Sequence, residues 1–63
     1  MTTMIIDNKA TSNKAYESYT VDRNEYPTVE DLKDLAYECM NKEVYLIRVF
    51  EDNNELFTIR NYQ

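Results

Sequence analysis

The chain has 63 residues, a net charge of −5 from 12 acidic and 7 basic side chains, and one cysteine. This length supports one domain, residues 1–63, with a thin hydrophobic core, and the lone cysteine excludes an internal disulfide. The acidic balance argues against direct binding of nucleic acid, because phosphate contacts need Lys and Arg.

The N-terminal third contains two candidate strands. An apolar run predicts a short strand within Met1–Asp7, and the polar stretch Asp7–Asn13 is typical of a loop. β-branched and aromatic residues in Ala15–Val21 predict a second strand. The sequence leaves open whether residues 1–13 are ordered before a partner binds.

The stretch Thr28–Asn41 has the start, the face and the end of a helix. Thr28 is a favourable N-cap, and Asp31, three residues later, completes a variant of the capping box. Apolar residues recur at three- and four-residue steps and form one stripe: Val29, Leu32, Leu35, Ala36, Cys39 and Met40. We expect the helix to pack through this stripe, with Cys39 as a core residue rather than a reactive thiol.

Acidic residues line another side of the same helix. Glu30, Asp34 and Glu38 follow at four-residue steps, so they stack along one side and form what we call the acidic ladder. Tyr37 lies beside the ladder and is a candidate interface anchor. The ordinary interpretation is a solvated helix face. The alternative is a surface that docks on a basic protein surface, including one that normally holds nucleic-acid phosphates.

Two strands separated by a short polar loop follow the helix. The segments Val44–Glu51 and Glu55–Tyr62 flank Asp52-Asn53-Asn54, which predicts a β-hairpin. Together with the earlier elements, the hairpin gives the order ββαββ. The sequence therefore predicts an α+β fold with one helix packed on a small antiparallel sheet.

The register of the hairpin follows from burial. A two-residue turn at Asn53-Asn54 would mix polar and apolar residues on both faces. A three-residue loop sets Ile47 opposite Ile59 and Val49 opposite Phe57, which gives one apolar face. Such a loop needs a left-handed residue at its end, which Asn54 tolerates. We therefore predict the three-residue loop.

This register divides the hairpin into two faces. The face expected to contact the helix consists of Tyr45, Ile47, Val49, Phe57 and Ile59. The outer face consists of Val44, Leu46, Arg48, Phe50, Leu56, Thr58, Arg60 and Tyr62. An exposed apolar patch suggests a partner, unless the N-terminal segment covers it or the register differs. The candidate dimer interface is Leu46, Arg48, Phe50, Arg60 and Tyr62.

The residue types on which most catalysis depends are missing. The chain has no histidine, the usual general base and metal ligand, and no glycine, which phosphate-binding loops require. The acidic loop Glu51–Glu55 lacks the glycine and the spacing of an EF-hand. We expect no enzymatic activity, no cofactor and no bound metal. No apolar run approaches a membrane span and the N-terminus does not resemble a signal peptide, so we expect a cytoplasmic protein with no membrane partner.

Two functional hypotheses from different classes remain. The first is a small acidic inhibitor or adaptor that occupies a basic site on a larger protein, such as a nucleic-acid enzyme. Its candidate partner-binding residues are Glu30, Asp34, Tyr37 and Glu38, extended by Glu51, Asp52 and Glu55. In size, acidity and lack of catalytic residues the chain resembles the small inhibitors that bacteriophages make against nucleic-acid enzymes, such as anti-CRISPR proteins and uracil-DNA glycosylase inhibitors. The second hypothesis is a small homodimeric structural or regulatory subunit that associates through the outer face.

Overall fold

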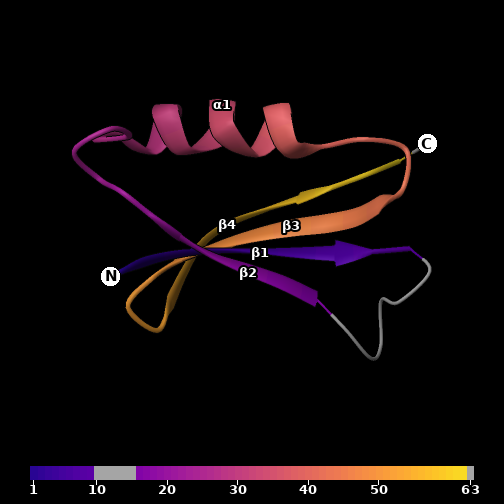
Figure 1. The fold of residues 1–63 in the computed structure, drawn as a ribbon, viewed down its shortest axis with the longest axis horizontal. Helices are drawn as coiled ribbons and strands as arrows, with labels where there is room; N and C mark the ends of the chain where they lie inside the picture. Colours follow the sequence, from indigo (N-terminus) through magenta and orange to yellow (C-terminus); the bar gives the residue numbers. More distant parts are fainter. Residues whose placement is uncertain (10–15, 63) are drawn as a thin grey trace.

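The computed structural model describes residues 1–9 and 16–62 and contains the predicted order of elements (Figure 1). The elements are β1 (Thr2–Asn8), β2 (Tyr16–Val21), α1 (Val29–Cys39), β3 (Val44–Glu51) and β4 (Asn54–Arg60). The order ββαββ and the α+β class are confirmed. Most of the loop predicted at Asp7–Asn13, and the start of the second strand at Ala15, lie outside the described residues.

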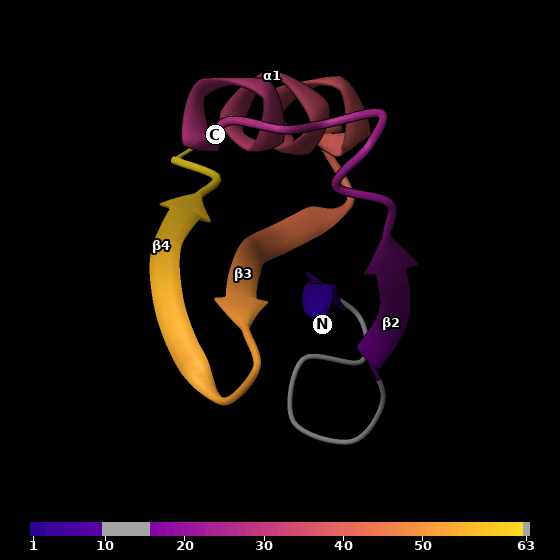
Figure 2. The same ribbon diagram turned by 90° about the vertical axis from the view of Figure 1, so that its left-hand side faces the viewer.

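The four strands form one antiparallel sheet in the order β2-β1-β3-β4. The first strand of the chain therefore lies inside the sheet, between β2 and β3. Helix α1 runs along one face of the sheet, and β2 and β4 are the two edge strands of the sheet (Figure 2). Because β1 is a strand of the sheet, it extends the outer face and does not fold over it.

The helix begins as the sequence predicts. The Thr28 side chain accepts a hydrogen bond from the Asp31 backbone N–H at 3.1 Å, and the Asp31 carboxylate accepts one from the Thr28 N–H at 3.1 Å. This reciprocal capping box satisfies two donors at the helix start. The helix ends at Cys39, two residues before the predicted Asn41, because Met40 has extended backbone angles, φ −74° and ψ 133°.

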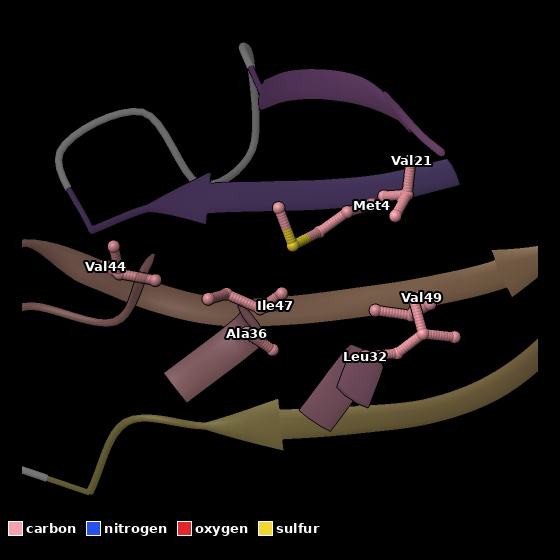
Figure 3. Close-up of a cluster of buried hydrophobic side chains, with 7 residues drawn as sticks. All are labelled: Met4, Val21, Leu32, Ala36, Val44, Ile47 and Val49. Atoms are coloured by element: carbon pink, nitrogen blue, oxygen red, sulfur yellow. The ribbon is translucent and has the colours of Figure 1, made fainter. Parts of the chain in front are cut away.

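The hydrophobic core lies between α1 and the two central strands (Figure 3). Leu32 and Ala36 from the helix are 1% and 0% exposed, and Ile47 of β3 beneath them is 0% exposed. The buried cluster as a whole is Met4, Val21, Leu32, Ala36, Val44, Ile47 and Val49. Leu35, Cys39 and Met40 are partly buried against this cluster, as expected from the apolar stripe. Val29, at the start of the stripe, is exposed.

The predicted hairpin register is confirmed, but a different turn produces it. Ile47 lies opposite Ile59 and Val49 opposite Phe57, as predicted. Glu51 pairs with Asn54, however, so the turn contains two residues, Asp52 and Asn53. The left-handed residue is Asp52, at φ 56°, instead of Asn54.

A β-bulge in β4 restores the register that a two-residue turn alone would have shifted. Phe50 pairs with Glu55 while Val49 pairs with Phe57, so Leu56 is the extra residue. The predicted pairing of apolar residues is thus reached by a short turn and a bulge.

A second bulge, in β3, makes the predicted assignment of Val44 and Tyr45 to the two faces wrong. Asp7 lies opposite Leu46 and Asn8 opposite Val44, which leaves Tyr45 as the extra residue. Because of this extra residue, the side chains before Leu46 point to the opposite faces of the sheet from those that strict alternation predicts. Val44, predicted on the outer face, is therefore 4% exposed in the core, whereas Tyr45, predicted to contact the helix, is 42% exposed.

The bulge at Tyr45 predicts an unequal response to truncation of two adjacent residues. Val44→Ala should lower the free energy of unfolding by about 2 kcal/mol, because it removes buried methyl groups and leaves a cavity. Tyr45→Ala should have a much smaller effect, although its side chain is larger. Urea unfolding of both variants measures this, and a larger loss for Tyr45→Ala would contradict the bulge.

The capping box gives a prediction for the start of the helix. Thr28→Ala should lower the free energy of unfolding by about 1 kcal/mol, because the Asp31 N–H loses its acceptor. Thr28→Ser keeps the hydroxyl and serves as the matched control. Thermal unfolding followed by circular dichroism should rank the wild type and Thr28→Ser above Thr28→Ala.

Candidate functional site

The acidic ladder lies on an exposed face of α1. Glu30, Asp34, Tyr37 and Glu38 are all exposed, with the Glu30 side chain 83% exposed and Tyr37 63%. Because the apolar stripe faces the sheet, these four exposed residues lie on the solvent side of the helix. Figure 1 shows the helix along one face of the sheet. The structure thus brings together the four helix residues predicted to bind a partner.

The ladder has little internal compensation of charge. Lys33 Nζ lies 3.9 Å from Glu30 Oε1, a weak surface pair. Asp34 and Glu38 form no ion pair or side-chain hydrogen bond with any residue in 1–9 or 16–62. Two of the three ladder carboxylates are therefore free to meet an incoming cation.

Glu51 and Asp52 belong to a different structure, which we call the N-terminal ion network. Glu51 Oε1 accepts hydrogen bonds from Thr2 Oγ1 at 2.6 Å and from Arg23 Nη1 at 2.7 Å. The α-amino group of Met1 lies 3.2 Å from Glu51 Oε2 and 2.6 Å from Asp52 Oδ1. These charges join β1, the segment before the helix and the turn of the hairpin, so they serve the fold and do not extend the ladder.

Arg23 was not singled out by the sequence, because it lies in an unpatterned polar connection. Its Nε donates to the Tyr26 carbonyl at 3.0 Å, and its Nη2 donates to the Pro27 carbonyl at 2.8 Å. Through its further contacts with Glu51 and Thr2, the guanidinium ties the entry of the helix to the sheet. It therefore holds the capped end of α1, and the ladder with it, in one orientation.

The N-terminal ion network also shifts two ionisation equilibria. The hydrogen bond from Thr2, followed by that from the α-amino group of Met1, lowers the pKa of Glu51 from its ordinary value of 4.5. The carboxylates of Asp52 and Glu51 in turn raise the pKa of the α-amino group. Both shifts favour the charged forms.

The remaining predicted partner-binding residue, Glu55, lies on the outer face of the sheet. Its carboxylate accepts a hydrogen bond from Thr58 Oγ1, and it lines a hollow of about 650 Å³ together with Arg48 and Arg60. The seven predicted residues thus fall into three places: the helix face, the N-terminal ion network and the outer face.

The outer face contains all five residues of the predicted dimer interface, but it is less apolar than expected. Leu46, Arg48, Arg60 and Tyr62 line the 650 Å³ hollow, and Phe50 lines a second hollow of about 300 Å³ with residues of β1. Leu46 is only 8% exposed and Phe50 is half-buried, whereas Tyr62 is 90% exposed. The accessible part of this face is therefore mainly polar, with Glu55, Thr58, Arg60 and Tyr62 exposed.

The sequence did not indicate a partly buried ion pair on this face, between Asp7 and Arg48. Asp7, predicted at the boundary of a loop, is 7% exposed and accepts a hydrogen bond from Arg48 Nη2 at 3.2 Å. The Nε of Arg48 is buried and has no hydrogen-bond partner among the described residues. This pair occupies the guanidinium of Arg48, which leaves Arg60 as the accessible cation of the hollow.

Cys39 has the environment of a packing residue. It is partly buried against the core, and burial, followed by the nearby charge of Glu38, raises the pKa of its thiol. A raised pKa lowers the thiolate fraction and hence the reactivity.

The described residues hold no group of three or more His, Cys, Asp or Glu side chains arranged to bind a metal ion. Within the same part of the chain, the helix is too short and too polar to cross a membrane. Comparison with protein-family models, curated protein sequences and solved structures finds no match to this chain. The function must therefore be argued from these surfaces.

The lowered pKa of Glu51 gives a pH prediction. A depressed folded-state pKa stabilises the protein at pH values above the unfolded value of about 4.5, and this stability is lost as the pH falls through the folded-state pKa. Glu51→Gln should therefore be less stable than the wild type at neutral pH, and the difference should shrink on acidification. Urea unfolding along a pH series tests this, with the exposed substitution Glu43→Gln as control. A difference independent of pH would contradict it.

Proposed function

We propose that this protein is a non-enzymatic protein-binding module that docks on a basic surface of a larger protein and inhibits it. The acidic ladder of α1 is the docking surface, and a protein that binds nucleic acid is the target class that fits it best. The observation that carries the proposal is the exposure of three carboxylates in one row, two of them without a counter-ion among the described residues.

The ladder is pre-organised for binding. The row spans about 12 Å of a regular helix, because each residue adds about 1.5 Å of rise. Its helix is capped at Thr28 and rests on the core through Leu32 and Ala36. Docking therefore does not require the helix to become ordered, and this lowers the entropic cost of association.

Charge supports the same surface. The net charge of −5 attracts a basic partner from a distance, and the ladder directs that attraction to one face. Tyr37 beside the ladder is 63% exposed and offers an aromatic side chain to the centre of an interface. The lack of histidine and glycine in the sequence supports binding over catalysis.

Reversal of the unpaired ladder charges tests the proposal. Asp34→Lys/Glu38→Lys should abolish retention of a basic partner from a cell lysate, whereas the wild type should retain it at low salt and release it at high salt. Glu30 is left unchanged, because a lysine in the first turn would oppose the helix dipole.

The matched control is Glu17→Lys/Glu43→Lys, which makes the same change in net charge at exposed positions outside the helix. This variant should retain the partner nearly as well as the wild type. Equal retention by the ladder variant and the wild type would overturn the proposal. Equal loss in both variants would assign the binding to net charge and not to the ladder.

A further inference from the structure

The outer edge of β4 carries backbone groups that the described sheet does not use. The Asn61 N–H donates to the Tyr45 carbonyl at 3.0 Å, so Asn61 bonds towards β3. Alternate residues of an antiparallel strand bond to the same neighbour. Phe57 and Ile59 therefore also bond to β3, whereas the N–H and C=O groups of Thr58 and Arg60 point away from the sheet. Figure 2 shows β4 at this margin.

This edge has few of the features that normally block strand pairing. The segment Asn54–Arg60 contains neither proline nor lysine, and its bulge at Leu56 lies near the turn. Residues 57–60 continue as a regular strand with an exposed edge. The edge is thus available to a further strand.

The charges of β4 are self-complementary for antiparallel pairing. The strand has one acid, Glu55, near one end and one base, Arg60, at the other, and both side chains line the outer-face hollow. Arg60 has no carboxylate partner in residues 1–9 and 16–62, and its Nη1 donates a hydrogen bond to the Tyr45 hydroxyl at 3.4 Å. Two antiparallel copies bring each Glu55 towards the Arg60 of the other copy.

The apolar residues of β4 fit the same arrangement. With Thr58 on the two-fold axis, Phe57 of each copy lies opposite Ile59 of the other. Arg60 then lies opposite the bulge at Leu56, next to Glu55. Phe57 and Ile59 pack against the core on the helix side but are only half-buried. A second β4 covers them, and cross-strand apolar pairs of this kind stabilise a sheet.

The opposite margin does not have this symmetry. The only charged residue in Tyr16–Val21 is Glu17, so antiparallel pairing of two β2 strands offers this acid no base. Of the two strands at the margins of the sheet, only β4 therefore has an acid and a base placed for antiparallel pairing with a second copy.

We propose that two copies of this chain associate through antiparallel pairing of their β4 strands into a continuous sheet of eight strands. The interface is isologous, so each Glu55–Arg60 contact occurs twice. This inference goes beyond the proposed docking function, because it uses the edge of the sheet and not the helix face.

Charge exchange between copies tests the pairing. The wild type should sediment as a dimer, and Glu55→Arg or Arg60→Glu alone should weaken the dimer by about tenfold or more, because each places like charges together twice. An equimolar mixture of the two variants should form a heterodimer, since both contacts again join opposite charges. The double exchange Glu55→Arg/Arg60→Glu should restore the homodimer.

Sedimentation equilibrium over a range of concentrations measures these outcomes, and circular dichroism confirms that each variant is folded. A wild type that stays monomeric at every concentration would overturn the proposal, as would a mixture that fails to form a heterodimer. Phe50→Glu, on the outer face, should leave the dimer intact. Loss of the dimer in this variant would overturn the β4 pairing and indicate an interface on the outer face. Asp34→Lys/Glu38→Lys should also leave the dimer intact, so failure of the docking function and failure of the dimer are distinguishable.

Discussion

The packing of α1 on the two central strands determines which surfaces of this protein are left over. Leu32 and Ala36 meet Ile47 in a core that excludes water almost completely. A single helix about 10 Å wide covers only part of the width of a four-stranded sheet. The solvent side of the helix, the outer face and the edge of β4 therefore stay accessible, and charged side chains populate each of them.

Local patterns in the sequence were sufficient to predict the elements. The capping box at Thr28 and the apolar periodicity of the helix involve only neighbours in the chain, and both are present. The pairing of Ile47 with Ile59 was also predictable, since burial favours one register strongly. The bulge at Tyr45 was not predictable, because it depends on how β3 meets β1, a strand from the other end of the chain.

The same distinction explains which part of the candidate site could be predicted. Helical periodicity alone places Glu30, Asp34 and Glu38 in one row, so the ladder follows from the sequence. The role of Glu51 in the N-terminal ion network does not follow from the sequence, because its partners, Thr2 and Arg23, lie 49 and 28 positions away in the chain. An acid in a polar loop looks the same in the sequence whether it is solvated or held by an arginine.

The interior position of β1 has a consequence for the order in which the protein folds. Helix α1 and the β3–β4 hairpin join residues close in the chain, so their formation costs little loop entropy. Strand β1 pairs with β3 across most of the chain, from Thr2 opposite Glu51 onwards. During synthesis, β1 emerges first but cannot acquire both neighbours until β3 has been made. Strand β1 is thus completed only after residues 44–51 have been synthesised, and the core around Met4, Ile47 and Val49 cannot close before then.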